Sequence, residues 1–193
     1  MSDSHAPAVL AQFDFSRPTV GLEVAVIIWW DPAAGRLLQQ TARGCACCCD
    51  AVADSDPLDA DPVTPDELAE LLRQRDLSTA DEEQPPQYRR ERRHRARITV
   101  QAARELLAGA SAPSSARTRA LVRAAAQPGH VIHPLGVTEA DVLILETLGL
   151  AAVLDGCGHA PGTPDPRLAH QGHLHVLRLT EAGLALATAA ALR

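Results

Sequence analysis

The chain has 193 residues, of which 46% are apolar and 22% are charged, a balance typical of a soluble globular protein. Its net charge of −6 argues against a general nucleic-acid coat or an anionic-membrane binder, and its 3% of aromatic residues argues against a stacking platform for single-stranded nucleic acid. All 18 basic residues are arginine, so the lysine chemistry of Schiff bases and phosphate-binding loops is excluded.

The length favours one domain. We predict it over residues 1–193, with an N-terminal tail at 1–17, an acidic and then basic segment at 54–97, and a terminal strand and helix at 173–193. The first residues lack a basic, apolar signal peptide. The longest apolar run, Val24–Trp30, is too short to span a bilayer. We therefore expect a cytoplasmic protein with no membrane partner.

Strands and one helix are predicted in the first half of the chain. Val20–Trp30 is rich in Val, Ile and Trp and lies between two prolines, which predicts a buried strand. Gly44–Asp50 predicts a second, shorter strand. Asp50–Glu83 holds 12 of the 24 carboxylates, and within it Pro65–Arg75 predicts a helix that Thr64 caps. The first half is therefore expected to combine a sheet with an acidic helical segment.

A dense basic run follows this acidic stretch. Six arginines and His94 lie within the nine residues of Arg89–Arg97. Such a run could bind phosphate or RNA. Charge compensation by the preceding carboxylates is a sufficient account, however, and we favour it over a nucleic-acid partner, which the sequence does not exclude. Ile98–Ala102 then predicts a strand that leaves the run.

Short strands and capped helices alternate in the second half. The clearest helix is Glu139–Leu148, which Thr138 caps and Gly149 ends. The alternation predicts an α/β fold, a single domain with a mixed β-sheet flanked by helices. We expect Val24–Ile28 and Ile98–Val100 to take part in that sheet. The remaining predicted elements are a helix capped by Ser114 or Ser115 that reaches Ala126, strands at His130–Ile132, Ala151–Leu154 (also in the sheet) and Leu174–Leu179, and a terminal helix capped by Thr180.

Four of the five cysteines lie within Cys45–Cys49. Their spacing could hold a soft metal if Cys157 and His159 supplied further ligands. Because adjacent residues of a strand face opposite sides, we predict instead a buried, reduced strand without metal. The histidine group at His159–His175 offers a second metal site, since its last two members lie two residues apart and would share one face. The interpretation that we favour for this group is a polar loop and an edge strand.

The helix Glu139–Leu148 is apolar on most sides, which predicts that it is buried and that its N-terminus is held rigidly. Free backbone N–H groups, the Thr138 hydroxyl and the helix dipole would then form an anion site. The alternative is that Thr138 only caps the helix. The sequence leaves both interpretations open.

Several short motifs follow one another in an order known from one enzyme family. Pro128–Leu135 is similar to a Pro-Gly-His-Val-Phe-Pro-Leu segment with one extra residue. Gly136–Ala140 is similar to a Gly-His-Thr-Glu-Ala motif whose helix ends in Gly-Leu, as at Gly149–Leu150. Upstream, Ala108–Ala112 and Ile98–Val100 are similar to Thr-Gly-Ile-Ser-Ala and Phe-Thr-Val. In this order of motifs the chain resembles the 3,4-dihydroxy-2-butanone 4-phosphate synthase family of riboflavin biosynthesis.

The resemblance implies a fold of the synthase type with a site for a sugar phosphate. It implies that His130 is the essential histidine, that Gly136 and Thr138 belong to the phosphate site, and that the catalytic carboxylate falls at Asp155 or Gly156. We therefore name His130 and Asp155 as candidate catalytic residues, and Gly136 and Thr138 as candidate substrate-binding residues. The resemblance also leads us to consider a homodimer.

The sequence departs from this family at the metal site. The family's metal-binding histidine is Val137 here, its acidic magnesium loop corresponds to Trp29–Gly35 with one acid, and the hairpin that carries its phosphate-binding arginine is missing. Because magnesium prefers several carboxylate ligands, we name no metal and no cofactor, and we expect the lyase chemistry on ribulose 5-phosphate to be weakened or lost.

The predicted function is a diverged synthase-like protein that binds a sugar phosphate or another small anion. If it is an enzyme, we expect a lyase or isomerase that acts on a phosphorylated sugar, with His130 as general acid or base. The alternative is a non-catalytic regulatory protein, or a protein that binds thiols or metal through Cys45–Cys49.

Overall fold

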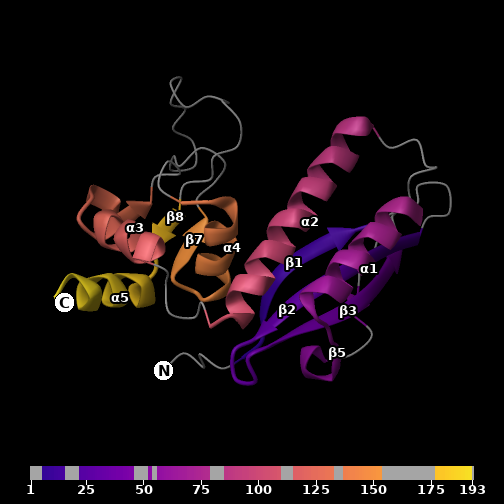
Figure 1. Ribbon diagram of the computed structural model, residues 1–193, viewed down its shortest axis with the longest axis horizontal. Coiled ribbons are helices and arrows are strands. Elements are labelled where there is room, and N and C mark those ends of the chain that lie inside the picture. Colours follow the sequence, from indigo (N-terminus) through magenta and orange to yellow (C-terminus); the bar gives the residue numbers. More distant parts are fainter. Residues whose placement is uncertain are drawn as a thin grey trace. The chain divides into compact units, whose positions relative to one another are not determined.

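The computed structural model of the chain describes residues 6–15, 22–45, 52–53, 56–78, 85–109, 115–132, 137–153 and 177–192 (Figure 1). The chain divides into two compact units, Met1–Gly109 and Ala110–Arg193, which we call unit 1 and unit 2. Each unit contains helices and a sheet, so the predicted α/β class is confirmed. The prediction of one domain over residues 1–193 stays a prediction.

The prediction of a single mixed sheet is wrong for the described strands. They form two sheets, one in each unit, and every pairing is antiparallel. The physical reason is that a tight turn joins the two longest strands, and a hairpin connection forces neighbouring strands to run in opposite directions. The predicted sheet members Val24–Ile28 and Ala151–Leu154 therefore belong to different sheets.

Three long strands make up most of the sheet of unit 1. β1 (Ala8–Asp14) pairs with β2 (Leu22–Asp31), and β2 pairs with β3 (Arg36–Cys45) along their whole length. Two short strands, β4 (Val52–Ala53) and β5 (Asp61–Pro62), each pair with β3. The buried strand predicted over Val20–Trp30 is confirmed as β2.

The structure corrects two other predictions for this sheet. Ala8–Asp14 were assigned to an N-terminal tail at 1–17, yet they form the edge strand β1, because their larger apolar side chains are mostly buried. Of the second strand, predicted at Gly44–Asp50, Gly44 and Cys45 form the end of β3, and residues 46–50 lie outside the described residues. β3 starts earlier than predicted, at Arg36, because the turn at 32–35 returns the chain directly after β2.

Asp31 holds the turn between β2 and β3. Its Oδ1 accepts hydrogen bonds from the backbone N–H groups of Ala33 and Ala34, each at 3.1 Å, and its Oδ2 accepts from Arg36 Nε at 3.1 Å. Gly35 has a φ of 60°, in the region that favours glycine. Burial alone would raise the pKa of Asp31, but these hydrogen bonds and the Arg36 charge outweigh burial and lower it. Trp29–Gly35, which the resemblance compared with a magnesium loop, therefore forms the end of β2 and a structural hairpin turn.

Two long helices follow the sheet, α1 (Pro65–Ser78) and α2 (Pro86–Leu107), after a short 3₁₀ helix at Pro57–Asp59. The predicted start of α1 is confirmed. Thr64 Oγ1 accepts from the Glu67 N–H at 3.2 Å, and the Glu67 carboxylate accepts from the Thr64 N–H at 2.9 Å. This reciprocal pair is a capping box, which fixes the first turn of α1.

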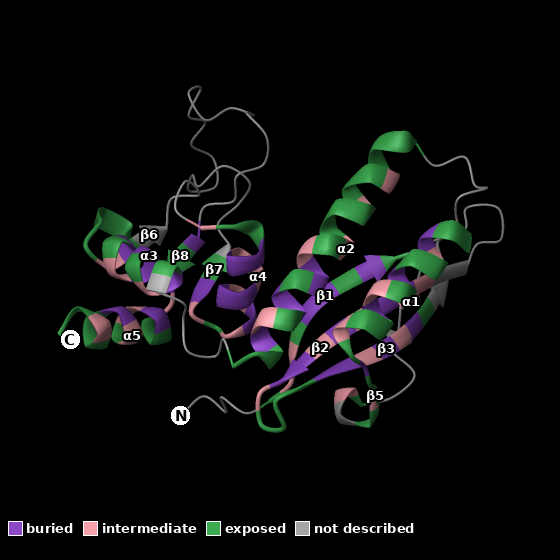
Figure 2. Ribbon diagram, viewed as in Figure 1, coloured by how far each residue is buried: buried purple, intermediate pink, exposed green. Residues whose placement is uncertain are grey.

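The strand predicted at Ile98–Ala102 is wrong, because these residues lie inside α2. Their β-branched side chains favour a strand locally. The buried residues Thr99, Val100, Ala103 and Leu106 recur at helical spacing, however, and packing of that side overrides the local preference. Figure 2 shows buried positions in the part of α2 nearer its C-terminal end and none near its start.

Unit 2 arranges short strands in the order β6-β8-β7 beside helices. Its core contains Leu121 of α3, Leu145 of α4 and Leu177 of β8. The helices and strands predicted for this half are confirmed within the described residues, with ends that shift by a few positions. The elements are α3 (Ser115–Ala125), a 3₁₀ turn (Pro128–His130), β6 (Val131–Ile132), α4 (Glu139–Thr147), β7 (Ala151–Val153), β8 (Leu177–Leu179) and α5 (Glu181–Ala191).

Candidate functional site

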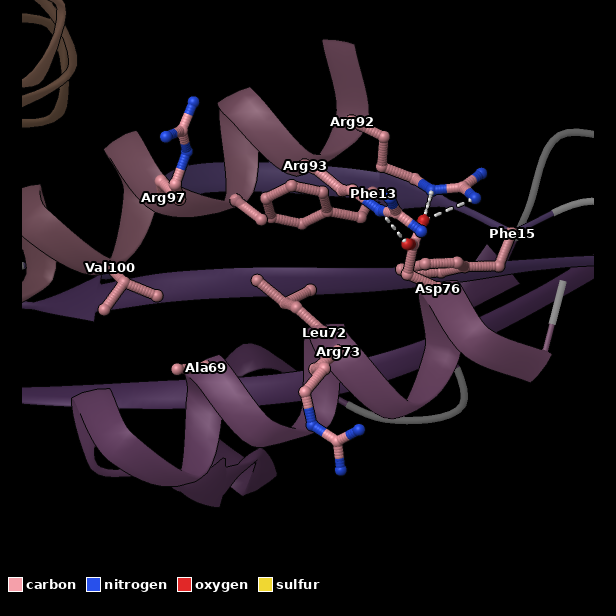
Figure 3. Close-up of a pocket in the computed structure, with 11 residues that line it drawn as sticks. Phe13, Phe15, Ala69, Leu72, Arg73, Asp76, Arg92, Arg93, Arg97 and Val100 are labelled. Carbon is pink, nitrogen blue, oxygen red and sulfur yellow. Dashed lines mark hydrogen bonds and ion pairs between the residues drawn. The ribbon is translucent and has the colours of Figure 1, made fainter. Parts of the chain in front are cut away.

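A pocket of about 250 Å³ lies in unit 1 between β1, α1 and α2 (Figure 3). Its floor is apolar and its surroundings are rich in guanidinium groups. The lining residues are Phe13 and Phe15 of β1 and its end, Ala69, Leu72, Arg73 and Asp76 of α1, and Arg92, Arg93, Ala96, Arg97 and Val100 of α2.

The periodicity of three elements brings these residues together. Phe13 and Phe15 are two residues apart, so both rings point to the same side of the strand. The lining residues of α1 and of α2 recur every three or four positions and therefore lie on one side of each helix. Phe13, Leu72 and Val100 are all buried, which gives the pocket a fixed apolar floor.

Asp76 joins the two helices at one end of the pocket. Arg92 donates to Asp76 Oδ1 from two nitrogens, at 2.8 and 3.0 Å, and Arg93 Nε donates to Oδ2. The Arg92 guanidinium also stands over the Phe15 ring, 5.2 Å from its centre. Burial alone would raise the pKa of Asp76, but the hydrogen bonds and charges of both arginines outweigh burial and lower it. Asp76 is therefore a carboxylate that both arginines hold in its charged form.

Arg73 and Arg97 extend from α1 and α2 on opposite sides of the pocket (Figure 3). Arg73 binds the exposed carboxylate of Glu70, and hydrogen bonds from Arg73 and Gln74 lower the pKa of Glu70 to about 2. Arg97 donates to His94 Nδ1 at 3.2 Å. The pocket thus combines an apolar interior with cations at its edge, which suits a ligand with an apolar body and one negative group.

The predicted site residues lie in unit 2, away from these elements in the sequence. His130 is exposed, has a φ of 52°, and places Nδ1 3.0 Å from the carbonyl oxygen of Ala125, near the end of α3. Thr138 precedes α4 as its cap. Gly136 and Asp155 lie outside the described residues, so the structure brings no predicted pair of site residues into contact among those that it describes.

The N-terminus of α4 already holds a carboxylate of its own chain. Thr138 Oγ1 accepts from the Asp141 N–H at 3.1 Å and donates to Asp141 Oδ2 at 2.8 Å. Asp141 Oδ1 accepts from Arg117 at 2.6 Å in a buried ion pair. Because Asp141 complements the positive end of the helix, an external anion would meet a like charge there. The hydrogen bonds therefore show the capping role of Thr138, which the sequence had left as one of two alternatives.

The cysteine and histidine groups lie almost entirely outside the described residues. Cys45 is the last residue of β3, while Cys47–Cys49, Cys157 and the group at His159–His175 are not described. Among the described residues, no group of three or more His, Cys, Asp or Glu could hold a metal ion. The buried, reduced strand without metal stays a prediction. In the same part of the chain, every helix is too short or too polar to cross a membrane.

Comparison with family models, with curated proteins and with solved structures found no match to the chain. Function must therefore be argued from the geometry of the pocket. Sequence reasoning did not find this pocket, because its lining comes from three elements far apart in the chain. The signal that could have found it is the pair Phe13 and Phe15, together with the helical spacing of Arg92, Ala96 and Val100 once α2 is taken as one helix.

Proposed function

We propose that this protein is a non-catalytic binding protein whose unit 1 pocket holds a small amphipathic carboxylate. The single observation that carries the proposal is an apolar floor bordered by guanidinium groups in one pocket. Binding of a small anion was also predicted from the sequence. The proposal assigns this binding to residues of β1, α1 and α2.

The size of the pocket limits the ligand. A volume of about 250 Å³ is below the roughly 300–1,000 Å³ of most drug-sized sites, so the apolar body is comparable to one aromatic ring or a short branched chain. Burying about 100 Å² of such a body contributes about 2.5 kcal/mol. One charge-assisted hydrogen bond from an arginine adds about 1.5 kcal/mol, and the two contributions together predict binding in the millimolar range.

The ionisable groups that line the pocket favour binding over catalysis. Four of them are arginines, which stay protonated in proteins. The fifth is Asp76, whose pKa is lowered by Arg92 and Arg93 in spite of its burial. The lining thus consists of guanidinium groups, an ion-paired carboxylate and apolar side chains, a set that suits binding of an anion better than general acid or base chemistry.

The test compares carboxylates with their neutral amides. Amide chemical shifts of the full chain are followed by NMR during titration with phenylacetate and 3-methylbutanoate, and then with phenylacetamide and 3-methylbutanamide. Ala96→Leu adds a larger side chain to the lining and should abolish the shifts. Ala189→Leu, the same change at an exposed position of α5, is the matched control. Equal binding of acid and amide would contradict the anionic class, and unchanged binding by Ala96→Leu would contradict the pocket.

A second candidate is the synthase-like function of unit 2 predicted from the resemblance. One local observation favours it: α4 begins after Thr138 and ends before Gly149, which has a φ of 65°, as expected for a helix between the Gly-x-Thr and Gly-Leu motifs. The assay is conversion of ribulose 5-phosphate to dihydroxybutanone phosphate and formate with magnesium present. We expect at most a trace rate, which His130→Ala should remove.

A further inference from the structure

The two halves of α2 differ in how far their side chains are buried. In the C-terminal half, Thr99, Val100 and Leu106 are buried in the core of unit 1. In the N-terminal half, Pro86–Arg97, no residue is buried, although Arg92 and Ala96 are partly covered. A helical segment that is polar on all sides is stabilised by charge pairs or serves a surface contact, since no apolar face fixes it.

An arginine stripe runs along the outer side of α2. We define it as Arg90, Arg93, Arg97 and Arg104, which follow one another at intervals of three, four and seven residues. Such spacing places all four on one side of a helix, nearly opposite the buried Thr99. All four are exposed, and His94 lies beside them. The stripe is therefore a row of exposed arginines about 21 Å long at 1.5 Å per residue, with the neutral Gln101 between Arg97 and Arg104.

Charge compensation within the chain, predicted from the sequence, is only partial for this surface. Asp76 binds Arg93, whose side chain is still 59% exposed. Arg104 binds Asp66 in an exposed pair, which contributes little in water. Arg97 contacts the neighbouring His94, and Arg90 makes no ion pair with a described residue. Arginines at i, i+3 and i, i+4 along the stripe also repel one another.

We infer that the arginine stripe of α2 binds the phosphate backbone of a double-stranded nucleic acid. One guanidinium group can donate two parallel hydrogen bonds to a single phosphate group. A row of arginines therefore suits the closely spaced phosphates of a duplex. An α-helix of this kind also fits the width of the DNA major groove. Arg93 and Arg97 also line the pocket, whereas Arg90 and Arg104 do not, so a change at Arg90 tests the stripe without altering the pocket.

The side chains of the stripe favour a duplex over other polyanionic partners. A single strand is bound by stacking on aromatic rings, and a protein interface has an apolar or aromatic centre. The exposed surface of the stripe has neither, because the Phe13, Leu72 and Val100 side chains beside Arg93 and Arg97 are buried. The exposed aromatic residue of α2, Tyr88, lies two positions before Arg90 and so points to another side of the helix. Since the chain as a whole carries a charge of −6, the interaction should be confined to the stripe and weaken steeply with salt.

The test measures fluorescence anisotropy of labelled 16-base-pair duplexes with the full chain at several salt concentrations. A DNA duplex and an RNA duplex of the same sequence are compared, to show which phosphate backbone the chain binds. Binding of either duplex supports the inference. Arg90→Glu should weaken binding about tenfold at 50 mM salt and reduce the salt slope by about one to two. Arg123→Glu, the same charge change at an exposed position of α3, should leave binding within about twofold of the parent chain.

Three results would overturn the inference: no duplex binding at 50 mM salt, an equal loss in Arg90→Glu and Arg123→Glu, or equally tight binding of the single strand. Circular dichroism of both variants checks that the helices are intact. Because Arg90 lies outside the pocket, Arg90→Glu should leave carboxylate binding unchanged, whereas Ala96→Leu should leave duplex binding unchanged. Failure of one proposal is thus distinguishable from failure of the other.

Discussion

Replacing Asp76 with Asn should destabilise unit 1, because it removes the carboxylate shared by Arg92 and Arg93. The Asp76 side chain is 9% exposed and that of Arg92 is 11% exposed, so this is a buried pair. Removing one partner of a buried pair typically costs about 3–5 kcal/mol, because the other charge is left uncompensated. Arg93 is 59% exposed and can regain water, so we expect a loss of about 2–3 kcal/mol for Asp76→Asn.

Intrinsic fluorescence measures this loss in unit 1 alone. The two tryptophans of the chain, Trp29 and Trp30, both lie in β2. Urea unfolding followed by tryptophan emission at pH 7 therefore reports the free energy of unfolding of unit 1. Glu70→Gln is the control, because it removes one carboxylate from an exposed ion pair and should leave the midpoint almost unchanged.

The pH dependence gives a second, independent check. The folded pKa of Asp76 lies below its ordinary value of 3.8. The carboxylate therefore stabilises the fold fully above about pH 4, and this contribution is lost as the pH falls through the folded pKa. The difference in unfolding free energy between the parent chain and Asp76→Asn should shrink in the same range. A loss no larger than that of Glu70→Gln, or a difference that persists undiminished at pH 2, would refute the reasoning.

Three further predictions concern single backbone and capping positions. Thr138→Ala should cost unit 2 about 1 kcal/mol, seen as a lower melting temperature by circular dichroism, because the α4 cap is lost; an unchanged melting temperature would contradict the cap. Gly183→Ala should also destabilise unit 2, although alanine normally favours a helix, since its Cβ would lie 1.9 Å from the Leu150 carbonyl oxygen; a higher melting temperature would show that this contact relaxes. Gly35→Ala should cost unit 1 about 1 kcal/mol by urea unfolding, because its φ is 60° and the space around it is open; a neutral result would mean that the turn changes type.

Local signals made several elements predictable from the sequence. Thr64, Thr138 and Thr180 each precede a helix in the structure, and a cap depends only on residues within one turn. The β2 strand was predictable because its apolar run is continuous and bounded by prolines. The same approach failed at Ile98–Ala102, where β-branched residues favour a strand but burial of one side of α2 decides in favour of a helix.

The pocket was beyond local reasoning because it depends on side chains that meet only after folding. In the sequence, nothing distinguishes Asp76 from the other carboxylates of the acidic stretch, or Arg92 from the other arginines of the basic run. Charge balance predicts that such segments attract each other, but not which residues become buried together. The pairing is selective: Asp76 is buried in its ion pair with Arg92, whose partly covered guanidinium lies over Phe15, while Arg90 on the same helix is exposed. Packing of the core thus determines which of these charges form covered ion pairs and which stay exposed at the surface.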